Sequence, residues 1–370
     1  MCGSTLFHVL RKQNISLYAC VSSNAVIVKK KGRGIFAILR PFPVGRYFDF
    51  YTALSQIPFG VLPFYMPLTN KRTLIYNDKK EGDESMLEIG LSTCGFAMNE
   101  ENFSALFAAG IRFAEISVAF ESYAELDHRG IKRAADVAGV RLWSYHLPFS
   151  NASTFDIAST DEMMRRSTVA AVSEYIKRGS DIGIEKFVIH PCGEPKSRDA
   201  ESREEEILRS MESLNDLAEL AATEGAVIAV EDLPRSCLGN HAAELARLIS
   251  VNDKLRVCFD TNHLLKEDPV DFIERIGHKI ITLHVSDFDF INERHWLPGE
   301  GKLDWQAIYQ KLLEKGYTGP WLYELGQKAP KTIDRRPLTF IDYYRNAMEI
   351  FEGKQPTPIG VPKENLGMWG

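Results

Sequence analysis

VIAVEDLP (227–234) and VCFDTNH (257–263) each consist of a short apolar run followed by a carboxylate. Two similar runs, TLHVSDFD (282–289) and WLYELG (321–326), follow them along the chain. Runs that are apolar on both faces are typical of strands in a parallel sheet that helices cover. Because a parallel barrel collects the ends of its strands at one mouth, we expect the polar residues that close these runs to converge.

An alternation of strand-like and helix-like segments extends over most of the chain. The earlier strand-like runs are LEIGLSTCGF (87–96), FAEISVAF (113–120), VRLWSYHLPF (140–149) and KFVIHPC (186–192). Segments with apolar residues at i, i+3 and i+4 are predicted helices, and they cover 161–180, 203–224, 240–250, 268–277, 304–315 and 338–352. Eight strand-and-helix units predict an α/β fold, a (β/α)8 TIM barrel over residues 87–353.

The two ends of the chain do not follow this alternation. Residues 1–86 carry twelve Lys or Arg and five Asp or Glu, with no helical or alternating period. We expect an N-terminal extension that is disordered or is not native, with Met86 as the native start; peptides from residues 1–80 of the natural protein would contradict the second expectation. The alternative is a basic docking segment. The tail, 354–370, is rich in Pro and Gly and predicts an irregular wrap or a flexible end.

Composition excludes several classes of protein. The net charge is −6, and residues 87–370 alone sum to about −13, so the barrel would repel nucleic acid, which is not an expected partner. No apolar run reaches the roughly 18 residues that span a bilayer, and no secretory signal opens the chain. The six cysteines form no CxxC pair, so neither a disulfide framework nor a cysteine zinc site is indicated. These features predict a cytoplasmic protein.

Four residues on the last four strands form the candidate metal site: Glu231, Asp260, His284 and Glu324. Three carboxylates and one imidazole suit a divalent ion such as Mn²⁺, Mg²⁺, Co²⁺ or Zn²⁺. Without a cation, carboxylates gathered in one mouth would repel each other. A single carboxylate at a strand end is often only a helix cap, but four such residues on successive strands predict a site. The neighbouring Asp232 and Asp287 should point the other way and have structural roles.

The same motifs resemble the xylose isomerase-like TIM barrel superfamily. VIAVEDLP, CFDTNH, LHVSD and ERHWLPGEGKLDWQAIYQKLLEKGYTGPWLYEL (293–325) carry the resemblance, which covers about residues 87–352. This superfamily holds sugar isomerases and epimerases such as tagatose 3-epimerase and hydroxypyruvate isomerase, together with inosose dehydratase and endonuclease IV. The resemblance implies a divalent metal ion at the positions of the four residues named above.

In the isomerase and epimerase branch, the resemblance implies proton abstraction next to a carbonyl, through an enediolate. Glu231 and Glu324 would be the catalytic base and acid as well as metal ligands, and the substrate would be a small sugar, sugar phosphate or hydroxy-keto acid. Four histidines would bind substrate hydroxyls: His146, His190, His263 and His295. Trp143, Trp296 and Phe149 are candidates for an apolar wall against the sugar, although a Trp in a barrel strand is more often core.

Endonuclease IV is the strongest alternative that the resemblance offers. It is a phosphodiesterase with several zinc ions, and its additional ligands match His146, His190, His263, Glu293 and His295. One departure is Glu293, which stands where that enzyme has Asp, and its extra methylene displaces the carboxylate by more than the roughly 0.2 Å tolerance of a metal bond. The acidic barrel is a second objection, because cleavage of DNA requires cations that neutralise phosphates.

Two more functions are compatible with the sequence. An inosose dehydratase-like lyase would share the first proton abstraction and then eliminate a hydroxyl group. A barrel could also bind a polyol or sugar acid without turning it over, and the two glutamates argue against this function. Homo-oligomers are common in the superfamily, but the sequence carries no interface signature.

Overall fold

The computed structural model describes residues 15–20, 25–30, 33–39, 86–197 and 199–368, and it divides into two compact units, 1–84 and 85–370. In the first unit, β1 (Ile15–Cys20), β2 (Ala25–Lys30) and β3 (Arg33–Leu39) form an antiparallel sheet in that order. The sequence pattern does not predict these strands, because periodicity cannot assign short apolar runs. The expectation of a disordered or non-native extension concerns residues that mostly lie outside the described part, and it stays a prediction.

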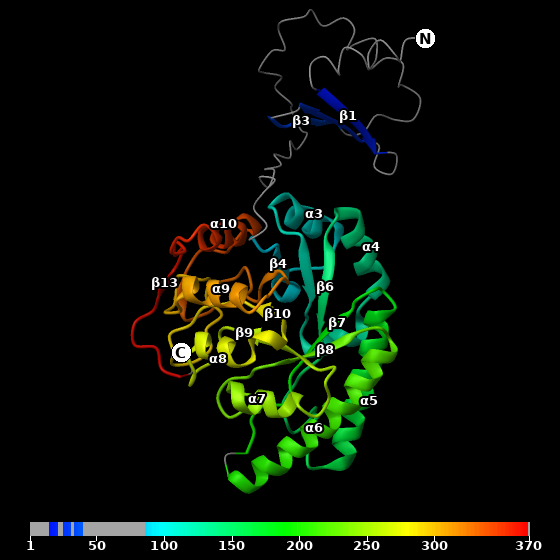
Figure 1. The fold of residues 1–370 in the computed structure, drawn as a ribbon, viewed down its shortest axis with the longest axis vertical. Helices are drawn as coiled ribbons and strands as arrows, with labels where there is room; N and C mark the ends of the chain where they lie inside the picture. The colour runs from blue at the N-terminus through cyan, green and yellow to red at the C-terminus, as the bar shows by residue number, and fades with distance from the viewer. Residues whose placement is uncertain (1–14, 21–24, 31–32, 40–85, 198, 369–370) are drawn as a thin grey trace, which may run out of the picture. The chain divides into compact units, whose positions relative to one another are not determined.

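The second unit is the predicted (β/α)8 barrel (Figure 1). Its parallel strands are β4 (Ile89–Ser92), β5 (Phe113–Ile116), β6 (Arg141–His146), β7 (Lys186–Ile189), β8 (Val227–Glu231), β9 (Arg256–Asp260), β10 (Ile280–His284) and β11 (Trp321–Tyr323). Each strand pairs with its neighbours in chain order, and β11 pairs with β4. The barrel closes where Val285 N donates to Leu322 O at 2.8 Å and Glu324 N donates to Val285 O at 3.2 Å.

Helices lie around the outside of the strands (Figure 1). They are α3 (Glu100–Ala108), α4 (His128–Ala138), α5 (Glu162–Ser180), α6 (Ala200–Thr223), α7 (Ala242–Ile249), α8 (Pro269–Ile276), α9 (Trp305–Glu314) and α10 (Phe340–Phe351). Local sequence sets their ends. At α8, for example, the Asp268 side chain caps the N-terminus, Pro269 opens the first turn, and Phe272, Ile273 and Ile276 are buried. Among the described helices, none has the length and apolar character needed to cross a membrane.

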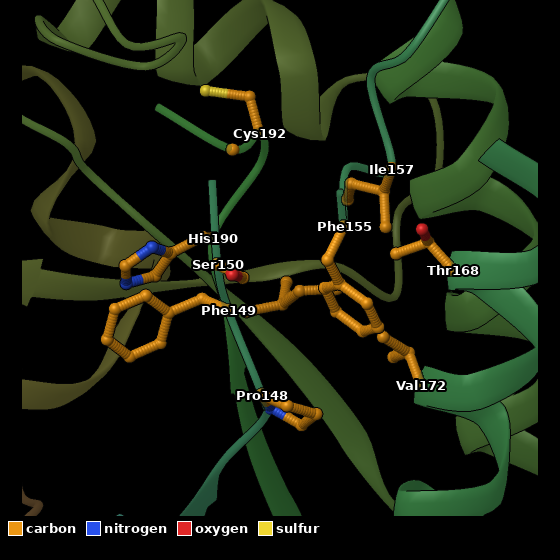
Figure 2. Close-up of a pocket in the computed structure, with 11 residues that line it drawn as sticks. Pro148, Phe149, Ser150, Phe155, Ile157, Thr168, Val172, His190 and Cys192 are labelled. Atoms are coloured by element: carbon orange, nitrogen blue, oxygen red, sulfur yellow. The ribbon is translucent and has the colours of Figure 1, made fainter. Parts of the chain in front are cut away.

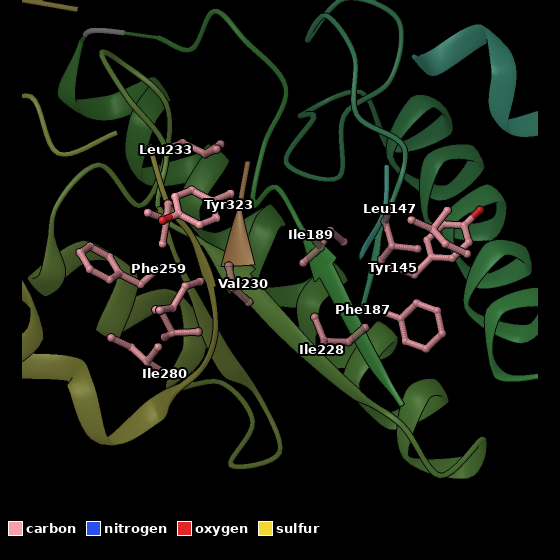
Figure 3. Packing of buried hydrophobic residues seen from close by; sticks show 14 of the residues in the cluster. Tyr145, Leu147, Phe187, Ile189, Ile228, Val230, Leu233, Phe259, Ile280 and Tyr323 are labelled. Atoms are coloured by element: carbon pink, nitrogen blue, oxygen red, sulfur yellow. The ribbon is translucent and has the colours of Figure 1, made fainter. Parts of the chain in front are cut away.

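Strand alternation decides which side chains enter the barrel. On β8, Ile228 and Val230 belong to the large apolar core, and Ala229 belongs to a small separate cluster with Val188 and Cys258. Figure 3 shows Ile228 and Val230 in the large core with other apolar side chains from the strands. Because Glu231 lies two residues after Ala229, it also projects into the barrel, one layer nearer the mouth. The same alternation applies to Asp260, two residues after Cys258.

The described part of the tail wraps against the loop between β10 and α9. β13 (Val361–Pro362) pairs with β12 (Ile333–Asp334), and Gly360 N donates to Glu300 Oε1 at 2.8 Å. Glu300 also forms a fully buried ion pair with Arg335, 2.6 Å long. The tail therefore lies on the same loop that carries Glu293 and His295.

Candidate active site

The four predicted metal ligands meet at the mouth of the barrel. Glu231, Asp260 and His284 are the last residues of β8, β9 and β10, and Glu324 follows β11 directly. One ligand atom from each lies within 4.8 Å of the other three. His284 Nδ1 is 3.1 Å from Glu231 Oε1, 3.1 Å from Glu324 Oε2 and 3.9 Å from Asp260 Oδ2. The convergence that the sequence predicts is present.

A fifth buried residue, Glu115 on β5, belongs to this group, although its place in the sequence pattern indicates no role. Glu115 Oε1 lies 3.0 Å from His284 Nε2, and Ser144 Oγ donates to Glu115 Oε2 at 2.7 Å. All three side chains are fully buried. The signal in the sequence was a carboxylate inside the apolar run FAEISV, where an unpaired charge would be costly.

The predicted substrate-binding histidines surround Glu231. His146 Nε2 lies 3.2 Å and His190 Nε2 lies 3.3 Å from Glu231 Oε2, and His263 Nδ1 lies 3.5 Å from Glu231 Oε1. His295, with its backbone in the left-handed region, lines the same cavity. The structure thus brings the four histidines together with the carboxylates.

Burial and crowding of like charges shift the pKa values of the site. Burial, with the charges of Glu231 and Glu324, raises the pKa of Asp260 to about 7. For Glu324, burial favours the neutral acid, but the charge of His284 and a hydrogen bond from it outweigh burial and lower the pKa to about 2. For His146, burial opposes the charge, yet the hydrogen bond to Glu231 raises its pKa to about 9. Negative charge therefore exceeds what the imidazoles neutralise.

A divalent cation fits the four-residue group. Asp260 Oδ2 and Glu231 Oε2 are buried oxygens without a hydrogen-bond donor, and such atoms are costly unless a cation or a donor satisfies them. Carboxylates and imidazole are ordinary ligands for Mn²⁺, Mg²⁺, Co²⁺ and Zn²⁺. His284 would present Nδ1, because Nε2 is engaged by Glu115.

The residues proposed for additional metal ions form a second group beside the first. Ligand atoms of His263, Glu293 and His295 lie within 4.8 Å of one another. Glu293 is already paired, since Oε2 lies 3.3 Å from His263 Nε2 and Oε1 accepts from Arg235 Nη1 at 2.7 Å. Burial would raise the pKa of Glu293, but the hydrogen bond with His263 and the charges of nearby cations hold it below its usual range.

A cavity of about 570 Å³ opens above these residues. Its lining combines the site residues Glu231, Glu324 and the four histidines with apolar side chains from several loops. Phe149 supplies the predicted apolar wall, because its ring stacks on that of His190 with centroids 4.2 Å apart. Figure 2 shows this ring beside the imidazole of His190, with Phe155 and Val172 in the small crevice behind it.

Two of the wall candidates do not line the cavity. Trp143 Nε1 donates to Thr282 Oγ1 at 3.2 Å. Trp296 is 2% exposed and donates to Thr332 Oγ1. Both indoles are thus core residues with satisfied N–H groups, the ordinary place for Trp in a barrel.

The two carboxylates expected to be structural have local partners. Asp232 Oδ1 accepts from the backbone N–H of Asp260 at 2.8 Å. Asp287 accepts from Gly299 N, Leu303 N and Trp305 Nε1, and so it holds the turn before α9. Neither lines the cavity.

Residues 103–342 match the family model of the xylose isomerase-like TIM barrel. The chain belongs to this family. It is 26% identical over 209 residues to the uncharacterised protein y4fM of Sinorhizobium fredii, covering 55% of this chain and 65% of that protein. It is 29% identical over 128 residues to fructoselysine 3-epimerase of Escherichia coli O157:H7, covering 32% and 45%. Both matches span less than two-thirds of the relative's own length.

A solved structure has the same fold. The crystal structure of a D-tagatose 3-epimerase-like protein superposes with a TM-score of 0.61 at 22% identity, and the match covers 72% of this chain and 97% of that one. At this identity the likeness concerns the fold, and it agrees with the barrel that the family model identifies.

Proposed function

We propose that this protein is a divalent-metal-dependent isomerase or epimerase of a sugar or a related hydroxy-carbonyl compound. The observation that carries the proposal is the convergence of Glu231, Asp260, His284 and Glu324 within 4.8 Å, in a cavity large enough for a small substrate. A divalent ion bound there would stabilise the negative charge that develops on a substrate carbonyl oxygen. The family and the epimerases among its relatives support the same class of reaction.

Glu231 and Glu324 would move the protons. Each has an oxygen 3.1 Å from His284 Nδ1, and both line the cavity, so they lie beside the same bound substrate. One carboxylate would take the proton from the carbon next to the carbonyl, and the electron pair would form the double bond of an enediolate. The other carboxylate would deliver a proton to that carbon on its other face in epimerisation, or to the neighbouring carbon in isomerisation.

The four histidines would orient the substrate. His146, His190, His263 and His295 offer ring nitrogens toward the cavity, where neutral imidazoles can donate to or accept from hydroxyl groups. Phe149 would exclude water from one side of the substrate. The test is incubation in D₂O with ketoses of four to six carbons and their phosphates. Deuterium should appear beside the carbonyl of at least one of them, and its absence from all would contradict the proposal.

A second candidate, an endonuclease IV-like zinc phosphodiesterase, is favoured by one observation. The groups His146, His190 and Glu231, and His263, Glu293 and His295, could each hold a further ion. Against it, Arg235 already occupies one oxygen of Glu293. Nicking of duplex DNA with an abasic site, above a metal-free control, would support this candidate.

An inosose dehydratase-like elimination is the third candidate, because it begins with the same proton abstraction. It differs in whether a hydroxyl group beside the forming double bond leaves as water. Product analysis by mass spectrometry distinguishes it, since elimination lowers the substrate mass by one water and isomerisation does not.

A further inference from the structure

The cavity carries more negative than positive charge. Of the described residues that line it, four are glutamates (Glu194, Glu231, Glu293 and Glu324), and Arg235 is the one with a permanent positive charge. Asp260 adds a further carboxylate to the proposed ion site. Together these carboxylates outnumber the charges of one divalent ion and one guanidinium, so the cavity would repel an anionic substrate.

Arg235 is committed to protein carboxylates. Its Nη2 donates to Glu194 Oε2 at 2.5 Å, its Nε donates to the other oxygen of Glu194, and its Nη1 donates to Glu293 Oε1 at 2.7 Å and Asn292 Oδ1 at 2.9 Å. A guanidinium whose fork is held by two carboxylates has little capacity to bind a phosphate as well. Lys196, on the same loop as Glu194, is buried against Asp156 and does not line the cavity.

The backbone groups that bind phosphate in many TIM barrels are also occupied. That site uses the loops after strands seven and eight, here β10 and β11, and a helix N-terminus. After β10, Asp287 accepts from Gly299 N at 2.8 Å and Leu303 N at 3.2 Å. After β11, the Asp342 side chain accepts from Thr339 N at 2.7 Å at the start of α10. Carboxylates of the protein thus stand where a phosphate would bind.

We infer that the substrate at this site is an uncharged sugar or polyol-derived ketone without a phosphate group. The inference rests on the proposed function and selects one substrate class from those it allows. Hydroxyl groups match the rest of the lining, because His146, His190, Ser117 and Ser150 offer neutral donors and acceptors.

The test compares matched pairs of ligands: D-fructose with D-fructose 6-phosphate, and D-tagatose with D-tagatose 6-phosphate. Their binding to the Mg²⁺-loaded full chain is measured by ligand-observed NMR at 150 mM salt. We expect each free ketose to bind at least tenfold more tightly than its phosphate. Replacing Glu194 with Gln releases one side of the Arg235 fork and should narrow this ratio several-fold. The control is Glu125→Gln, which removes the same charge from an exposed position outside the cavity and should leave the ratio unchanged.

Equal or tighter binding of the phosphates by the wild-type chain would overturn the inference, and so would an absence of binding by both free ketoses. Binding of a free ketose without deuterium exchange beside its carbonyl would support the inference on substrate class while contradicting the proposed reaction. The two proposals therefore fail in different measurements.

Discussion

Glu115 Oε1 lies 3.0 Å from Nε2 of His284, while Nδ1 of the same imidazole faces Glu231 and Glu324 at 3.1 Å. The hydrogen bond to Glu115 assigns the imidazole proton to Nε2 and leaves the lone pair of Nδ1 directed at the carboxylates. Ser144 in turn fixes the other oxygen of Glu115. A histidine that binds a metal ion commonly has such a carboxylate behind it, which sets its tautomer and orientation.

Replacing Glu115 with Gln should weaken metal binding. Loss of such a partner typically costs about 10- to 100-fold in affinity, so we expect a rise of that size in the Kd for Mn²⁺ measured by calorimetry. Ser144→Ala, which leaves the carboxylate and removes only its hydroxyl donor, should have a smaller effect. An unchanged Kd in a Glu115→Gln variant with the wild-type circular dichroism spectrum would show that Glu115 does not position His284.

Replacing Glu231 or Glu324 with Gln should remove catalysis while the barrel persists. A positioned acid or base contributes roughly 10²- to 10⁴-fold, and each glutamate is also a proposed ligand, so the loss should reach at least that range. The measurement is the rate of deuterium exchange into a ketose substrate. Glu125→Gln serves as the charge-matched control. Wild-type exchange in either site variant would refute the assigned roles.

His128 should make stability depend on pH. Its Nδ1 lies 3.0 Å from Leu126 O and its Nε2 lies 3.1 Å from Tyr145 Oη, an arrangement that suits the neutral ring. Burial lowers the pKa of His128, so the unfolded chain binds this proton more readily than the folded one. The contribution is complete above pH 6.5, the ordinary histidine pKa, and is lost as the pH falls below it.

The test of this linkage is urea unfolding of wild type and His128→Gln at pH 7.5 and 5.5. The wild-type free energy of unfolding should fall more steeply between the two pH values. The histidines of the barrel mouth titrate in both proteins, so their effect cancels in the comparison. Equal slopes would mean that His128 does not contribute.

Gly179 on α5 should not tolerate a larger residue. A Cβ at this position would lie 2.5 Å from Phe187 Cε1 and 2.8 Å from Cζ, and Phe187 is fully buried. Overpacking of this kind costs about 1–3 kcal/mol, against about 1 kcal/mol that alanine gains over glycine in a helix. We therefore expect Gly179→Ala to lower the free energy of unfolding. Gly367→Ala, where no atom lies within 4 Å, is the control that should change little.

The barrel and its four converging residues could be predicted because their signals are local. Apolar runs with a polar end mark strands, and the predicted helix at 161–180 corresponds to α5. Glu115 could not be assigned in this way, because it lies inside a strand and only the closed barrel brings it to His284. Trp296 follows His295 in the sequence, yet its side chain packs into the core. The pairing of Arg235 with Glu293 joins loops 58 residues apart, for which no periodic signal exists.

The most direct test of the central claim is the metal content of the full chain after loading with Mn²⁺ and dialysis. The four-residue site predicts one tightly bound ion per chain in the wild type, and a large loss in Asp260→Asn and in His284→Asn, each of which removes one proposed ligand. No bound ion in the wild type, or full retention in both variants, would contradict the account. About three zinc ions per chain after loading with Zn²⁺ would point instead to phosphodiester hydrolysis.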